Sequence, residues 1–232
     1  MTERGGTMAT GKRVALLAGS TGLVGGYVLR ELLASPLYSE LVAVTRKEIA
    51  ASDPKLKQIV GPLEELESAV AEAQVAATDA FCTLGTTIKV AGSQAAFRKV
   101  DFDYVVGFAR AAKAAGARNF ALVTAVGASA ESKIFYSRVK GEVEEAVKEI
   151  GFDALHIFHP GLLLGSRNES RQGESLMMKL SPFMNPLMIG SAAIYKSIPA
   201  ETVAAAMIAA VGRDGEGVKT YTYRQMVTLA EG

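Results

Sequence analysis

The sequence has few residues that could build a covalent or metal-centred framework. Cys82 is the only cysteine, and His156 and His159 are the only histidines. A single thiol excludes a disulfide framework and any site made of several thiolates. Neither histidine has the cysteine or acidic neighbours of a metal site, so we predict no metal.

The chain also lacks an excess of one charge and any long apolar run. It has 25 Lys and Arg against 24 Asp and Glu, which gives a formal net charge of +1. With this balance, the protein has no excess of positive charge that would bind nucleic acid or anionic lipid. Charges and glycines interrupt every apolar stretch before it reaches the roughly 18 residues of a membrane span. We therefore expect no transmembrane helix, no nucleic-acid partner and a cytoplasmic location.

A large apolar fraction, 49% of the 232 residues, is arranged in a regular alternation. Short runs that are apolar throughout predict buried strands, and the longer segments between them have helical periodicity. The predicted strands are 13–18, 41–45, 58–60, 79–84, 120–124 and 152–158. Such a pattern is typical of a parallel sheet covered on both faces. We predict the α/β class, with a Rossmann-type doubly wound parallel sheet.

The strongest local pattern lies directly after the first predicted strand, where a glycine-rich turn opens a helix. Its residues are Gly19, Ser20, Thr21, Gly22, Leu23, Val24 and Gly25. Glycines let backbone N–H groups approach a phosphate, and the helix N-terminus adds partial positive charge. The spacing GxxGxxG is a variant of the GxGxxG dinucleotide motif, and it predicts a pyrophosphate site. The alternative is a chance turn in a chain with 23 glycines.

The second predicted strand ends at Thr45 and is followed by two cations, Arg46 and Lys47. A site for NAD usually has an acidic residue here, which accepts a hydrogen bond from the ribose 2′-hydroxyl. Two cations suit a 2′-phosphate instead, and arginine offers bidentate geometry. We therefore predict NADP(H) in preference to NAD(H). The alternative is that both side chains belong to a solvated loop.

Tyr136 and Lys140 are four residues apart in a segment with helical periodicity, so both side chains lie on one helix face. The pKa of a free phenol is about 10, which is too high for efficient proton transfer at neutral pH. A nearby ammonium group favours the phenolate, so we expect Lys140 to lower the pKa of Tyr136. The YxxxK spacing also arises by chance, and its weight comes from its place in a domain with a glycine turn.

Together these motifs resemble the short-chain dehydrogenase/reductase superfamily. Further segments resemble its atypical branch around the Tat-interacting oxidoreductase-like proteins, namely Leu84-Gly85-Thr86-Thr87, 124–128, 140–144 and 159–167. The resemblance implies a Rossmann-type domain with bound NADP(H). It implies that Tyr136 is the proton donor, that Lys140 holds the nicotinamide ribose, and that Thr124 steadies the substrate carbonyl. Leu84, Gly85, Thr86, Thr87 and Pro160 would contact the cofactor, although a plain loop is an equal alternative for 85–87.

The predicted function is an NADP(H)-dependent oxidoreductase that reduces a small carbonyl substrate. The alternative is an NADP(H)-binding regulatory or assembly protein with little or no turnover. For the domain organisation we expect a flexible leader over 1–11 and a single nucleotide-binding domain over 12–232. A short C-terminal cap over 166–198 would lie on the substrate side, and a helix is predicted from Pro199 to Val211. The oligomeric state stays open.

Overall fold

The structure, a computed structural model, describes residues 13–165, 190–213 and 215–232. Its centre is a seven-stranded sheet in the order β3-β2-β1-β4-β5-β6-β9, and every neighbouring pair is parallel. The strands are β1 (Arg13–Ala18), β2 (Tyr38–Thr45), β3 (Leu56–Val60), β4 (Asp79–Cys82), β5 (Asn119–Val123), β6 (Ala154–Phe158) and β9 (Gly217–Tyr221). The predicted Rossmann-type parallel sheet is confirmed.

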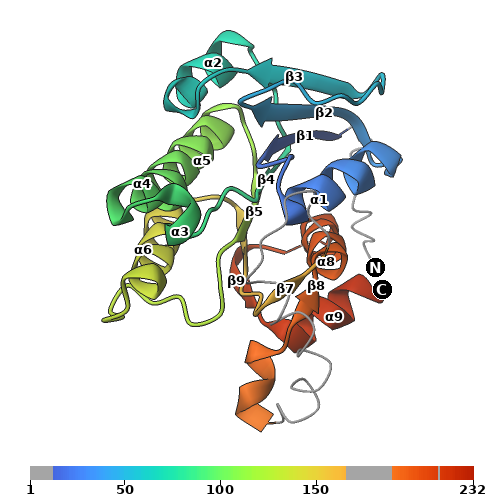
Figure 1. Cartoon of the computed structure of the whole chain (residues 1–232). Helices are drawn as coiled ribbons and strands as arrows, with labels where there is room; N and C mark the ends of the chain where they lie inside the picture. Colours follow the sequence, from blue (N-terminus) through green and yellow to red (C-terminus); the bar gives the residue numbers. More distant parts are fainter. Residues whose placement is uncertain (1–12, 166–189, 214) are drawn as a thin grey trace, which may run out of the picture.

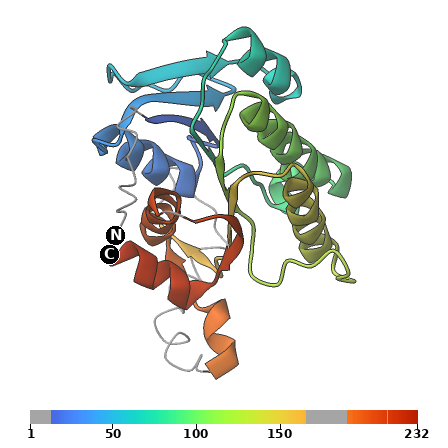
Figure 2. The same cartoon turned by 180° about the vertical axis from the view of Figure 1, so that it is seen from behind.

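Helices cover both faces of the sheet (Figure 1). On one face lie α1 (Leu23–Ala34), α8 (Ala200–Gly212) and α9 (Tyr223–Ala230), and on the other lie α2 (Leu66–Glu72), α5 (Tyr104–Ala114) and α6 (Phe135–Glu149). The same two layers are visible from behind (Figure 2). Alternate residues of β1 enter opposite cores: Leu17 packs with the first layer and Leu16 with the second. Strands that are buried on both sides have no polar face, which explains their uniformly apolar sequence.

Short elements connect the layers. They are η1 (Leu63–Glu65), α3 (Ile88–Ala91), α4 (Gln94–Arg98), the π-helical segment η2 (Lys99–Asp103), η4 (Gly190–Tyr195) and a pair of two-residue strands, β7 (Leu163–Leu164) and β8 (Ile198–Pro199). The segment between the predicted strands 79–84 and 120–124 has helical periodicity, and the structure divides it into α3, α4, η2 and α5.

Two elements at the C-terminal end were not predicted. Strand β9 is an edge strand whose side chains are largely exposed, with Val218 at 51%, so it has no apolar run to mark it. Helix α9 follows it and packs Met226 and Leu229 into the core. Helix α8 begins one residue after Pro199, which occupies its N-cap. The predicted leader and residues 166–189 of the predicted cap lie outside the described residues.

A buried carboxylate ties the amino ends of three strands together. Asp79 at the start of β4 accepts hydrogen bonds of 2.7 Å from the Arg13 guanidinium on β1 and from the Asn119 amide on β5. The Asp79 side chain is completely buried, so its charge needs these donors. This network lies at the amino edge of the sheet. It therefore leaves the opposite, carboxyl edge to ligand binding.

His156 lies inside β6 and is 2% exposed. Its Nδ1 is 2.9 Å from the Tyr221 hydroxyl on β9, and the two rings stack. Burial lowers the pKa of His156 from 6.5 to about 4, and the charge of Lys219 adds to this effect. The side chain is therefore a neutral core group that links the last two strands of the sheet.

This lowered pKa predicts a loss of stability in acid. The unfolded chain binds a proton at His156 near pH 6.5, whereas the folded chain binds it only near pH 4. The stability that the neutral His156 contributes is therefore fully present above pH 6.5 and is lost as the pH falls from 6.5 to 4. We expect the free energy of unfolding to fall by about 3 kcal/mol more in the wild type than in His156→Gln between pH 7 and pH 4. Urea denaturation across this range measures the difference. Tyr221→Phe is the control, because it keeps the histidine and should keep the acid sensitivity. Parallel stability curves for wild type and His156→Gln would contradict this account.

Candidate nucleotide-binding and active site

The glycine turn between β1 and α1 packs directly on the end of β4. Gly19 has φ of +87°, a left-handed conformation that strains other residues, and a Cβ there would lie 2.6 Å from the Thr83 carbonyl carbon. A Cβ on Gly25 would overlap the Gly19 carbonyl oxygen. The Gly22 N–H donates to that same oxygen at 2.8 Å. Two of the three motif glycines are therefore required by the backbone itself.

The amino end of α1 fits an anion. Its N-cap is Gly22, which makes no side-chain capping bond, and the first turn contains no acidic residue. Ser20, 3% exposed, has a hydroxyl oxygen without a hydrogen-bond partner among the described residues. Buried polar atoms are nearly always paired, and helix N-termini bind phosphate through their free N–H groups. These residues therefore fit the diphosphate of a dinucleotide.

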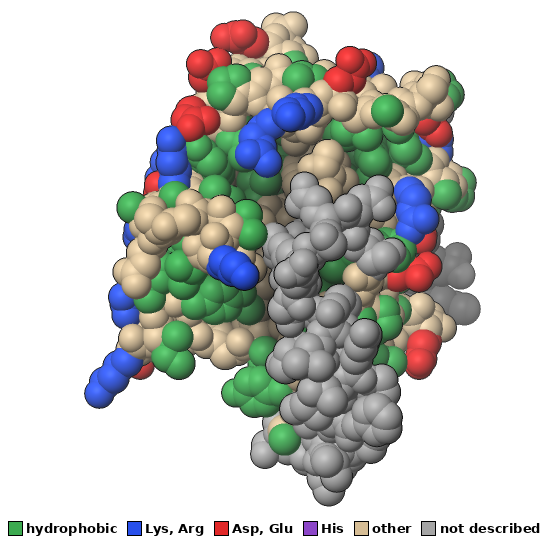
Figure 3. Space-filling view, in the orientation of Figure 1, with side chains coloured by type: hydrophobic (Ala, Val, Ile, Leu, Met, Phe, Trp, Pro, Cys, Tyr) green, Lys and Arg blue, Asp and Glu red, His purple; other side chains and the backbone are tan. Residues whose placement is uncertain are grey.

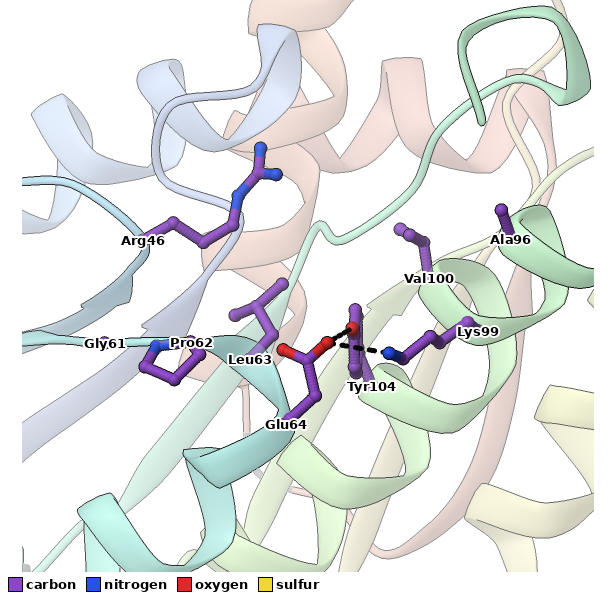
Figure 4. Close-up of a pocket in the computed structure, with 9 residues that line it drawn as sticks. All are labelled: Arg46, Gly61, Pro62, Leu63, Glu64, Ala96, Lys99, Val100 and Tyr104. Carbon is purple, nitrogen blue, oxygen red and sulfur yellow. Dashed lines mark hydrogen bonds and ion pairs between the residues drawn. The ribbon is translucent and has the colours of Figure 1, made fainter. Parts of the chain in front are cut away.

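A cavity of about 510 Å³ opens beyond the carboxyl ends of β2 and β3. Arg46, directly after β2, lies at one side of it, and Glu64, Lys99 and Tyr104 lie together at the other (Figure 4). Arg46 and Lys47 are both exposed, which agrees equally with contact to a ligand and with a solvated loop. In the space-filling view, Lys and Arg side chains lie close to apolar ones on this face (Figure 3). Sequence reasoning found Arg46 but missed the opposite wall, because those residues come from segments far apart in the chain.

Part of the predicted cofactor loop after β4 makes hydrogen bonds within the protein. The Thr86 N–H donates to Asp101 Oδ2 at 2.9 Å. The Thr87 hydroxyl accepts from the Val90 N–H at 3.3 Å and caps α3. Leu84 is half-buried and Gly85 is exposed. Of the loop's polar groups, the Thr86 N–H is thus used internally and is not available to a nucleotide.

Lys140 on α6 makes a buried ion pair with Asp101 in η2. The distance from Nζ to Oδ1 is 2.7 Å, and the two side chains are 6% and 0% exposed. Burial alone lowers the pKa of Lys140, but Asp101 and Tyr136 together raise it above its ordinary value. Burial raises the pKa of Asp101, and Lys140 opposes this effect. Asp101 was not predicted, since nothing in its local sequence distinguishes it from a surface acid.

Tyr136 lies one turn before Lys140, and its ring packs against Phe97 with centroids 5.5 Å apart. The expectation that its pKa is lowered was wrong. Burial raises the pKa of Tyr136 above 10; Lys140 lowers it, and the negative charge of Asp101 raises it again. Sequence spacing gave the lysine correctly but showed neither the burial nor the neighbouring carboxylate.

Thr124, at the end of β5, has its hydroxyl directed into the protein. It donates to Glu144 Oε1 at 2.5 Å, and the same oxygen lies 2.8 Å from His159 Nε2. Thr124 and Glu144 are each 6% exposed. The predicted role of Thr124 as a donor to a substrate carbonyl therefore competes with a buried carboxylate for the same proton. Glu144 was not predicted, although it continues the spacing of Tyr136 and Lys140 by one further turn of α6.

Pro160, the last predicted cofactor contact, is buried after β6, and its carbonyl accepts from the Val126 N–H at 3.0 Å. This bond joins the loops that follow β5 and β6. The structure thus brings the glycine turn, Arg46, the loop after β4, Tyr136, Lys140 and Pro160 to the carboxyl edge of the sheet. Ligands bind at this edge in open α/β sheets.

Solved structures with the same fold include nucleotide-dependent enzymes. The Bordetella bronchiseptica enzyme WbmH in complex with NAD+ has a TM-score of 0.65 at 15% identity, over 91% of this chain and 76% of that one. UDP-glucose 4-epimerase of Thermotoga maritima has a TM-score of 0.67 at 14% identity, over 94% and 82%. At these identities the likeness concerns the fold alone.

Closer relatives come from sequence comparison. Protein HTATIP2 of Rattus norvegicus is 37% identical over 204 residues, which cover 87% of this chain and 82% of that protein. The mitochondrial protein FMP52-1 of Scheffersomyces stipitis is 37% identical over 158 residues, 68% of this chain and 70% of that protein. In the described ranges, no helix combines the length and apolar character needed to cross a membrane. A family described as NAD(P)H-binding matches residues 19–214. With most of its length inside that match and these two relatives beside it, the chain belongs to the NAD(P)H-binding family.

Proposed function

We propose that this protein is an NADPH-dependent reductase of a small carbonyl compound. The observation that carries the proposal is the buried, unpartnered Ser20 hydroxyl at the uncapped amino end of α1. A phosphate oxygen would satisfy that hydroxyl together with the free N–H groups of the helix. Residues Gly19 to Gly25 would hold the diphosphate, and Arg46 and Lys47 would pair with the 2′-phosphate. Leu84, Gly85, Thr87 and Pro160 would line the remaining length of the nucleotide.

The bound nucleotide would supply a hydride to the carbonyl carbon. Tyr136 would donate its hydroxyl proton to the carbonyl oxygen as negative charge develops there, so that the product is the alcohol. Lys140 would hold the nucleotide's ribose and stabilise the phenolate that remains. We assign Thr124 to the buried cluster with Glu144 rather than to the substrate, because its proton is already donated.

The raised pKa of Tyr136 supports the reductive direction. A tyrosine that keeps its proton at neutral pH holds, in the free protein, the proton that the reductive direction transfers. We also retain the cytoplasmic location as a prediction, to be tested by cell fractionation because the related fungal protein is named as mitochondrial.

A second candidate is a nucleotide-binding regulator without turnover. The Thr124–Glu144 bond favours it, because a reductase of this type would need a second donor on the substrate oxygen. The two candidates differ in one measurement. Tight NADPH binding with no oxidation in the presence of any aldehyde or ketone screened would support the regulator.

Ser20→Ala tests the nucleotide site. The substitution removes no hydrogen bond of the described structure, so the thermal stability of the free protein should not fall. NADPH affinity should decrease roughly tenfold, because a hydrogen bond to a charged phosphate is lost. Isothermal titration calorimetry measures this affinity, and Ser52→Ala, at an exposed position in the loop before β3, is the control. Unchanged NADPH affinity in Ser20→Ala would remove the main support for the site.

Tyr136→Phe tests the proton donor. Turnover of the carbonyl compound should fall by about 10²- to 10⁴-fold, while NADPH affinity stays within about twofold. In the wild type, the loss of reduction at high pH should come later than for an unshifted tyrosine, because burial raises the pKa of Tyr136. Tyr223→Phe on α9 serves as control. Full activity of Tyr136→Phe would rule out this role.

Arg46→Gln tests the nucleotide preference. NADPH affinity should fall roughly tenfold and NADH affinity should change little, because only NADPH carries the phosphate that arginine pairs with. Arg110→Gln, at an exposed position of α5, makes the same change of charge elsewhere and should alter neither affinity. Equal losses for both nucleotides would show that Arg46 does not recognise the 2′-phosphate.

A further inference from the structure

Three side chains form a hydrogen-bonded cluster on the wall of the cavity opposite Arg46 (Figure 4). Glu64 Oε1 lies 2.7 Å from Lys99 Nζ and accepts a hydrogen bond of 2.5 Å from the Tyr104 hydroxyl. Glu64 follows β3, whereas Lys99 and Tyr104 belong to η2 and the start of α5. The cluster thus joins two segments across one end of the cavity, and the Lys99 and Glu64 side chains are 51% and 52% exposed.

The cluster holds two opposite charges next to each other. The hydrogen bonds from Lys99 and Tyr104 lower the pKa of Glu64 to about 2, so its carboxylate stays ionised across the physiological range. Hydrogen bonding to Glu64 also raises the pKa of Lys99. Their charges cancel, and Arg46 makes no ion pair with any described residue. Lys99 on one wall of the cavity is therefore paired with a carboxylate, whereas Arg46 on the facing wall is not.

The pair is not needed to hold the fold. Exposed ion pairs contribute little to stability because water screens them and their side chains lose freedom when they pair. A multiply charged anion that enters the cavity can therefore compete with Glu64 for Lys99 at small cost. Tyr104 keeps Glu64 in place during that exchange, since its hydroxyl binds the same carboxylate oxygen.

We propose that Lys99 and Glu64 are a specificity-determining pair for the nucleotide's 2′-phosphate: Lys99 is a second phosphate ligand facing Arg46, and Glu64 limits its strength. This inference rests on the proposed nucleotide binding and deepens it. The cavity recognises a phosphate monoester dianion from two sides, and the carboxylate sets how strongly the phosphate is preferred over a free 2′-hydroxyl.

A charge series tests this pair. Relative to the neutral wild-type pair, Glu64→Gln makes it positive, Lys99→Met makes it negative, and the double variant restores neutrality. The probes are 2′,5′-ADP and 5′-AMP, which differ only in the 2′-phosphate and contain no nicotinamide. We expect Glu64→Gln to bind 2′,5′-ADP roughly five- to tenfold more tightly and Lys99→Met five- to tenfold more weakly, with the double variant between them. Binding of 5′-AMP should change by less than about twofold throughout.

Lys57 and Glu40 provide the matched control. They form another exposed ion pair of 2.7 Å, between β3 and β2, and neither lines the cavity. Lys57→Met and Glu40→Gln repeat the same charge changes and should leave the affinities for both probes within about twofold. Calorimetry at low and moderate salt measures all variants, and the shifts at Lys99 and Glu64 should shrink as salt screens them.

The outcomes separate this inference from the proposed function. If both probes shift by the same factor in the charge series, or if neither shifts, Lys99 does not bind the 2′-phosphate and the inference is overturned while nucleotide binding stands. If the wild type binds neither probe, nor NADPH, the proposed function fails as well. Tighter 2′,5′-ADP binding in Glu64→Gln together with weaker binding in Lys99→Met, with 5′-AMP binding unchanged in both variants, supports the pair.

Discussion

The buried ion pair between Lys140 and Asp101 is the interaction on which the candidate site depends. It joins α6 to η2, and because Asp101 also accepts from the Thr86 N–H, it fixes the loop after β4 at the same point. Removing one partner of such a pair leaves an uncompensated buried charge, at a cost of about 3–5 kcal/mol. The positions of Tyr136, one turn before Lys140, and of the cofactor loop are therefore consequences of one electrostatic contact.

Segment η2 connects that contact to the cavity at the other end of the site. Lys99 opens the segment and lines the cavity, while Asp101, two residues later, is completely buried. Single π-helical turns are frequent at functional sites. Here the segment places the Lys99 side chain at the cavity and the Asp101 side chain in the core. Segment η2 thus contributes to both the cavity proposed for the nucleotide and the ion pair beside Tyr136.

The sequence allowed prediction of those features that depend on neighbours in the chain. Apolar runs indicated six of the seven strands, and the strand–glycine–helix order located the turn at Gly19, since both are local patterns. Strand β9 was not predicted, because an exposed edge strand has no apolar run. Asp101 and Glu144 were not predicted as site residues. Their partners, Lys140 and Thr124, lie on other elements, and only the folded chain brings them into contact.

The pKa of Tyr136 shows why such contacts decide chemistry. Lys140, one turn away, does lower the pKa of Tyr136, as a stabilised phenolate requires, but the negative charge of Asp101 offsets part of that effect. Burial then dominates and keeps the proton on the tyrosine. Transfer becomes favourable only when a new negative charge develops beside the hydroxyl, as on the oxygen of a carbonyl that accepts a hydride. In the proposed reduction, the protonated phenol is therefore the resting state from which the reaction would start.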